Sequence, residues 1–197
     1  GGAMEYPTVT QMGYYNRMPE TPNPKSLSFE DEAVVHETAH QWFYSIIGNN
    51  EFKDPILDES FTSYATARFF ENEYGEYNKL AVKGSFLAYI YDYNPPIYRS
   101  TDQYSWNDFA VIVYKIGPIV LEDLRRKVGD EKFDDIFKTY YNKYKYKNAS
   151  LEGFLDIVEE KGGSEVSEYI RKAFTSKDYS IEAMKLTDEE VKKILSN

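Results

Sequence analysis

The chain has 197 residues, of which 42% are hydrophobic and 17% aromatic, enough to bury a sizeable core in one large domain or two small ones. Its 23 Lys and Arg residues are outnumbered by 33 Asp and Glu residues, and the formal charge of −10 argues against nucleic acid or an anionic membrane surface as a partner. Cysteine is absent, which excludes disulfides and thiolate metal sites, so any metal must be held by histidine and carboxylate groups.

The start of the sequence carries no targeting information. It opens Gly-Gly-Ala without an initiator methionine, which favours a fragment of a longer chain and leaves the compartment undecided. No apolar run approaches the roughly 20 residues that a membrane-spanning helix needs.

The first half of the chain predicts one strand followed by helices. Prolines at four positions within residues 1–25 exclude a long helix there and leave a strand over residues 4–9, then a loop. Apolar residues recur at helical spacing over residues 28–47 and again over 58–74, each run being followed by a glycine that supplies a stop. A third helix is predicted over residues 77–93.

The second half begins with a proline-led loop over residues 94–106. Pro118 lacks an amide hydrogen and crowds the carbonyl four residues back, so the regular helix beyond it is expected to start or kink near residues 114–118. Further helices are predicted over residues 131–145, 151–161, 165–175 and 188–195. The chain is therefore mainly α-helical with an N-terminal strand. Residues 1–163 form one domain in this interpretation, and residues 164–197 form a helical appendage or the start of a following region.

A stretch over residues 140–148, "YYNKYKYKN", interleaves tyrosine and lysine as a single-strand-binding surface could. Its aromatic residues continue the helical spacing of Phe133, Ile136 and Phe137, which favours a core face with solvated lysines on the other side. Together with the negative charge, this predicts no nucleic-acid partner.

Both histidines of the chain lie four positions apart in "VVHETAHQWF". Residues four apart share one face of a helix, so His36 and His40 can direct imidazole nitrogens at a single zinc ion, at about 2.0–2.1 Å each. Glu37 follows the first histidine and is near enough to accept a proton from the attacking water without binding the metal. The alternative is two histidines satisfied by ordinary hydrogen bonds, but average composition predicts this pattern by chance in only about one chain of this size in a hundred. The pattern is His-Glu-x-x-His, which is typical of zinc peptidases.

Catalytic zinc needs a third protein ligand and one open position. Glu59, in "LDESFTSY", follows His40 after eighteen intervening residues, where a short connection folds the next helix back across the first. Asp58 would suit a role in orienting a ligand imidazole. Both acidic residues could instead stabilise the start of that helix through its dipole.

These residues resemble the aminopeptidase N family of zinc peptidases, the gluzincins that include leukotriene hydrolase. "HETAHQW" and "LDESF" are similar to the family's zinc signature, and "GAMEYP" is similar to its Gly-x-Met-Glu-Asn signature. "VYKIGPIVLEDLRRKVGDEKF" is similar to the segment in which the family places a tyrosine before a Lys-Gly pair at a helix entrance. The resemblance covers about residues 1–163. It implies a thermolysin-like zincin catalytic domain, α+β when complete, with one zinc ion.

The resemblance also implies roles for individual residues. Glu5, with its neighbours Ala3 and Met4, binds the substrate and recognises its free amino group, and Tyr114 donates a hydrogen bond to the oxyanion. Three positions depart from the family pattern: Tyr6 replaces an asparagine, Ser60 replaces a glycine, and Lys115-Ile116 precedes the glycine of the Lys-Gly pair.

The predicted function is that of a zinc-dependent aminopeptidase acting on peptides. Two alternatives stay open: a zinc endopeptidase whose amine recognition is altered by Tyr6, and a non-catalytic peptide-binding relative. The resemblance implies an N-terminal β-domain and a C-terminal helical domain in the full-length chain. The preferred N-terminal residue and the oligomeric state are not determined by the sequence.

Overall fold

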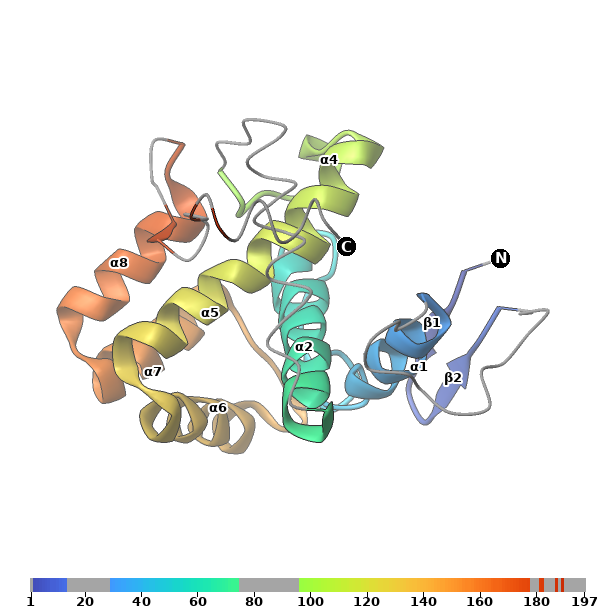
Figure 1. The fold of residues 1–197 in the computed structure, drawn as a ribbon, viewed down its shortest axis with the longest axis horizontal. Coiled ribbons are helices and arrows are strands. Elements are labelled where there is room, and N and C mark those ends of the chain that lie inside the picture. The colour runs from blue at the N-terminus through green and yellow to red at the C-terminus, as the bar shows by residue number, and fades with distance from the viewer. Residues whose placement is uncertain are drawn as a thin grey trace.

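The computed structural model describes residues 2–13, 29–74 and 96–177, together with residues 181, 182, 187 and 189. Within these residues the chain is helix-rich, as predicted. The hairpin β1–β2 and helix α1 lie at one end of the molecule, α2 and α5 in the middle, and α6, α7 and α8 towards the other end (Figure 1). Among the described helices, none combines the length and apolar character that a membrane span requires.

The N-terminal segment is an antiparallel hairpin. Strands β1 (Met4–Tyr6) and β2 (Val9–Gln11) pair with Glu5 opposite Thr10. The prediction of one strand over residues 4–9 was therefore wrong at its C-terminal end. Pro7 and Thr8 form the turn, with Thr8 in the left-handed region at φ 67°.

Helix α1 (Phe29–Ala39) ends eight residues before the predicted 28–47 helix does. The amides of Trp42 and Phe43 still donate to the Ala39 carbonyl, but Tyr44 then takes a φ of 105°, which no helix allows. The chain turns into strand β3 (Ile47–Gly48), which pairs in parallel with β4 (Lys147–Asn148). The sequence predicted that the apolar residues after Ala39 continue the helix. In the structure they lie instead in the turn before β3 and in β3 itself, which pairs with β4.

The next helix begins two residues before the predicted 58–74, as the π-helical turn η1 (Ile56–Ser60), and continues as α2 (Phe61–Tyr74). The helix predicted over 77–93 lies outside the described residues. Residues 96–100 are a loop, followed by the short 3₁₀ turn η2 (Thr101–Gln103).

A π-helical segment interrupts the central helix. Helix α4 (Trp106–Val111) leads into η3 (Ile112–Ile116), which leads into α5 (Gly117–Val128). This confirms that the regular helix starts near residues 114–118. In η3 the amide of Gly117 donates to the carbonyl of Ile112, five residues back.

Three helices follow close to their predicted bounds: α6 (Asp130–Tyr144), α7 (Leu151–Gly162) and α8 (Ser164–Thr175). Helix α8 buries Ile170, Ala173 and Phe174 in the same core as α5 and α7. The domain division after Gly163 stays a prediction, and the helix predicted over 188–195 lies almost wholly outside the described residues.

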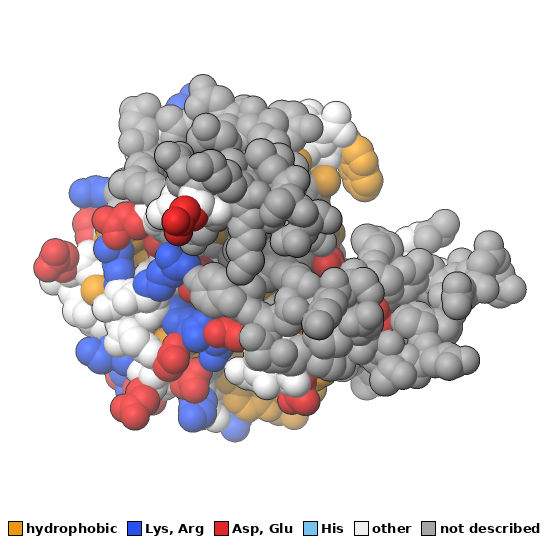
Figure 2. Space-filling model, viewed as in Figure 1, with side chains coloured by type: hydrophobic (Ala, Val, Ile, Leu, Met, Phe, Trp, Pro, Cys, Tyr) orange, Lys and Arg blue, Asp and Glu red, His pale blue; other side chains and the backbone are white. Residues whose placement is uncertain are grey.

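The core is rich in aromatic side chains. Phe61 contacts the rings of Phe137, Tyr140 and Phe154 at centroid distances of 5.7, 5.7 and 4.9 Å. Tyr140 is 1% exposed, which confirms that α6 turns its aromatic face to the core. Acidic and basic side chains are mixed on the surface over α5, α6 and α8 (Figure 2), as is typical of an ordinary solvated face.

Candidate metal centre

The side chains predicted to form the site come from four parts of the chain and converge at one place. Helix α1 and the turn after it supply His36, Glu37 and His40, the π-helical turn η1 supplies Asp58 and Glu59, β1 supplies Glu5, and η3 supplies Tyr114.

The three predicted ligands form a nearly equilateral triangle. His36 Nε2 lies 3.1 Å from His40 Nε2 and 3.1 Å from Glu59 Oε2, and His40 Nε2 lies 3.3 Å from Glu59 Oε2. Two ligand atoms of a tetrahedral zinc ion, each about 2.0–2.1 Å from the metal, are about 3.3 Å apart. Two imidazole nitrogens and one carboxylate oxygen are also a donor set that zinc uses in catalytic sites. The residues fit one zinc ion with a fourth position left for water or substrate.

The two carboxylate oxygens of Glu59 have different partners. Tyr114 donates a hydrogen bond of 2.6 Å from its hydroxyl to Glu59 Oε1, while Oε2 faces the histidines. Burial by itself raises the pKa of Glu59, but its contacts with His36 and His40 outweigh burial and lower the pKa to about 2. Burial and the Glu59 carboxylate raise the pKa of Tyr114, so its hydroxyl keeps its proton. Glu59 is therefore an anion, and Tyr114 is a donor beside it.

The Nδ1 atom of His40, which faces away from the other two predicted ligands, has its own polar partners. Its Nδ1 lies 2.8 Å from Asp58 Oδ1 and 3.1 Å from Thr62 Oγ1, and both residues are buried. A partner on Nδ1 orients the ring and leaves Nε2 free to bind a metal. Asp58 lies where the sequence predicted it. Thr62 was missed, although its place four residues after Asp58 on a continuous helical run could have suggested it.

Glu37 has the environment of a general base. The residue is 7% exposed, and its Oε2 accepts no hydrogen bond from the described residues. Burial raises the pKa of Glu37 to about 7, against the lowering effect of His40. A carboxyl group with a pKa near neutrality can both accept and return a proton at physiological pH.

Glu5 reaches the site from the hairpin. One of its carboxylate oxygens lies within 4.8 Å of ligand atoms of His40 and Asp58. Along β1 the exposure alternates, so Glu5 is half-buried while Met4 and Tyr6 are 44% and 48% exposed. Ala3, before the strand, is half-buried. The structure therefore brings the Glu5 side chain to the metal centre.

Gln41 fastens the hairpin beside the centre and was missed by the sequence analysis. Its side-chain oxygen accepts a hydrogen bond of 2.9 Å from the Thr8 amide, and its side-chain nitrogen donates one of 3.1 Å to the Tyr6 carbonyl. Gln41 directly follows His40, so the same turn presents a ligand and holds the strand that carries Glu5.

The helical fold and this centre define a zincin-like domain. A profile of the peptidase family M1 domain matches residues 1–173, and the chain belongs to that family.

Individual proteins similar to this chain are aminopeptidases by name. The chain is 26% identical over 199 residues to aminopeptidase N of Lactococcus lactis subsp. lactis, covering 95% of this chain and 23% of that protein. It is 27% identical over 156 residues to probable aminopeptidase 2 of Sulfurisphaera tokodaii, covering 75% of this chain and 20% of that protein. The chain thus spans less than a quarter of these relatives.

Solved structures share the fold. An M1 zinc metallopeptidase from Deinococcus radiodurans matches with a TM-score of 0.72 at 24% identity, over 91% of this chain and 38% of that one. An E323A mutant of an M1 zinc metallopeptidase from the same organism, bound to a Tyr-Ser-Ala substrate, matches with the same TM-score at 23% identity, over 90% of this chain and 38% of that one.

Proposed function

We propose that this chain is the catalytic part of a zinc-dependent aminopeptidase, which removes residues from the free N-terminus of peptides. The observation that carries the proposal is the triangle of His36, His40 and Glu59, with the buried Glu37 beside it, whose Oε2 accepts no hydrogen bond from the described part of the chain. Membership of family M1 and the aminopeptidase names of the curated relatives support the same activity.

The metal ligands are His36 Nε2, His40 Nε2 and Glu59 Oε2, and the cofactor is one zinc ion. When bound, zinc supplies Lewis-acid chemistry: it polarises the scissile carbonyl and lowers the pKa of the attacking water. Asp58 and Thr62 hold His40 in the orientation that this requires.

Glu37 accepts the proton of the attacking water and returns it to the leaving amine. Its raised pKa suits both steps, because a base that titrates near the working pH can also serve as an acid. Tyr114 keeps its proton and lies at the edge of the ligand triangle, where its hydroxyl can turn from Glu59 Oε1 and donate instead to the oxyanion of the tetrahedral intermediate.

Glu5 pairs with the terminal ammonium of the substrate. A carboxylate next to the metal fixes the distance from the free amine to the scissile bond, which makes cleavage exopeptidic. The residues before it, Ala3 and Met4, bind the substrate through the backbone of the same segment. We further propose that the full-length protein adds an N-terminal β-domain and a C-terminal helical domain, because the matched relatives are several times longer.

The decisive test is Glu37→Gln in the full-length protein, with Glu73→Gln, at an exposed position of α2, as the matched control. We expect kcat for a free peptide to fall about a thousand-fold in Glu37→Gln, because a general base contributes about 10²–10⁴. The zinc content of both variants should stay at one per chain. Retained turnover in Glu37→Gln would remove this residue as the base.

The two alternatives make different predictions. An endopeptidase would cleave an N-acetylated peptide as well as the free one, whereas the proposed enzyme should cleave only the free peptide. A non-catalytic relative would contain no zinc after purification and would take up none on reconstitution.

A further inference from the structure

We infer that Ser60 is a positioning residue for catalysis, and that it works as a matched pair with Gly117 to hold Tyr114 against Glu59. The inference deepens the proposed aminopeptidase function and rests on it. It starts from the two π-helical segments, η1 and η3, which carry the zinc ligand Glu59 and the oxyanion donor Tyr114 and pack against each other.

The η3 segment leaves one carbonyl without a backbone donor. The amide of Gly117, which would serve Val113 in an α-helix, donates instead to Ile112, five residues back. A π-helical hydrogen bond to the Val113 carbonyl would have to come from residue 118. That residue is Pro118, which has no amide hydrogen, so this bond cannot form either. Val113 is fully buried, and a buried carbonyl needs a partner.

Ser60 supplies that partner from the other π-helical segment. Its hydroxyl donates a hydrogen bond of 2.6 Å to the carbonyl of Val113, and Ser60 itself is fully buried. Ser60 directly follows Glu59, and Val113 directly precedes Tyr114. The bond therefore joins the two backbones one residue away from the 2.6 Å contact between Tyr114 and Glu59.

Gly117 is the other half of the pair. A Cβ atom at this position would lie 2.1 Å from Ser60 Oγ and 2.8 Å from Ser60 Cβ, closer than real atoms approach. The serine fits only because residue 117 has no side chain. A change at either position must therefore alter how η1 and η3 approach each other, and with it the place of the Tyr114 hydroxyl.

The packing is tested on the full-length, metal-free protein by thermal unfolding of Ser60→Gly, Gly117→Ala and the double variant. We expect Gly117→Ala to lower Tm markedly and the added Ser60→Gly to recover part of that loss, because it removes both clashing atoms but also leaves the Val113 carbonyl without its donor. Additive effects of the two substitutions would overturn the matched pair.

The positioning role is tested by kinetics of Ser60→Ala. We expect kcat to fall about ten-fold or more, since small misplacements of catalytic groups are costly, while KM and zinc content stay unchanged. The control is Ser167→Ala, which removes a similar buried bond of 3.0 Å, to the carbonyl of Leu155, and should leave kcat unchanged. An unaltered kcat in Ser60→Ala, or an equal fall in Ser167→Ala, would overturn the positioning role.

These results separate the two proposals. A zinc-loaded wild type that cleaves no peptide would refute the aminopeptidase function, and with it the positioning role. The unfolding data involve neither metal nor substrate, so they would still decide whether Ser60 and Gly117 are coupled.

Discussion

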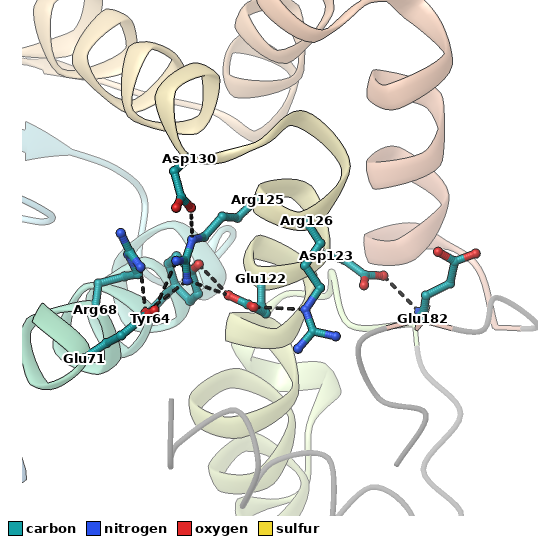
Figure 3. A network of polar contacts seen from close by, with 9 residues as sticks. All are labelled: Tyr64, Arg68, Glu71, Glu122, Asp123, Arg125, Arg126, Asp130 and Glu182. Atoms are coloured by element: carbon teal, nitrogen blue, oxygen red, sulfur yellow. Dashed lines mark hydrogen bonds and ion pairs between the residues drawn. The ribbon is translucent and has the colours of Figure 1, made fainter. Parts of the chain in front are cut away.

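Two polar clusters in this protein, one partly buried and one largely buried, differ in which groups balance their carboxylates. The first is an arginine network between α2 and α5 (Figure 3). Arg125 binds both oxygens of Glu71, at 3.0 Å each, and its Nε lies 2.5 Å from Asp130. Arg126 donates to Glu122 at 3.0 Å. In this network Glu71, Glu122 and Asp130 each form an ion pair with a guanidinium of the chain.

The second cluster is the metal centre, where the carboxylates of Glu5, Glu37, Asp58 and Glu59 gather around two imidazoles. Among the residues that the structure describes, no lysine or arginine forms an ion pair with any of these four. Buried charge is costly unless it is paired. The difference teaches that the arginine network is balanced by side chains of the chain, whereas the second cluster has only two imidazoles against four carboxylates, as we expect of a site that takes up a metal cation.

The largest effect in testing the difference between the two clusters is expected for Glu59→Ala. Removing one of three ligands should reduce zinc from about one ion per chain to a trace and turnover to background. The measurement is zinc content by plasma mass spectrometry after dialysis without added metal. A variant that keeps its zinc would show that the triangle does not hold the ion.

Arg125→Met should leave the zinc content unchanged and lower the free energy of unfolding by about 2 kcal/mol, because Glu71 loses its bidentate partner in a partly buried site and keeps only Arg68. Urea unfolding measures the change. The control is Arg171→Met, whose partner Glu152 is exposed and whose loss should cost less than about 1 kcal/mol. If both variants lost the same free energy of unfolding, the network would contribute no more to stability than an exposed ion pair.

Glu5→Gln should keep the metal and lose selectivity for a free amine. We expect kcat/KM for a free peptide to fall about ten- to hundred-fold, or about 1.4–2.7 kcal/mol, because the amide cannot pair with an ammonium group. The ratio of rates on free and N-acetylated peptides reports the change. An unaltered ratio would remove Glu5 from amine recognition.

Gln41→Ala should have the smallest effect, a rise in KM for free peptides of a few-fold, since two exposed hydrogen bonds to the hairpin each contribute about 0.5–1.5 kcal/mol. Steady-state kinetics on one free peptide are sufficient, with Gln103→Ala, at an exposed position of η2, as the control. If KM stays at the wild-type value, Glu5 does not depend on the Gln41 contacts for its position.

The ligands could be predicted because local geometry decides most of their arrangement. His36 and His40 lie one helical turn apart whatever the rest of the chain does, and Glu37 follows from the same turn. The prediction of Glu59 as a ligand depended on a further inference, that a short connection folds the next helix back across the first. By contrast, no spacing rule predicts the contacts of Gln41, since a side-chain amide bonds wherever a partner lies, and for Thr62 the only signal is its place four residues after Asp58.

The errors in the fold have identifiable causes, one tertiary and one local. The apolar residues after Ala39 suit a helix equally well, but pairing of β3 with β4, about a hundred residues away, ends α1 early. Pro7 and Thr8 could have been read as a turn, because proline commonly occupies such positions.

The sequence by itself determined the helices with strong periodicity, the two candidate histidine ligands and the candidate base, because these depend on contacts within a turn or two of helix. Only the tertiary structure decided how the segments meet. The bond from Ser60 to Val113 spans 53 residues, and it exists because η3 and Pro118 leave a carbonyl unpaired at the place where η1 packs. That partner is chosen by three-dimensional packing, which no short-range pattern records.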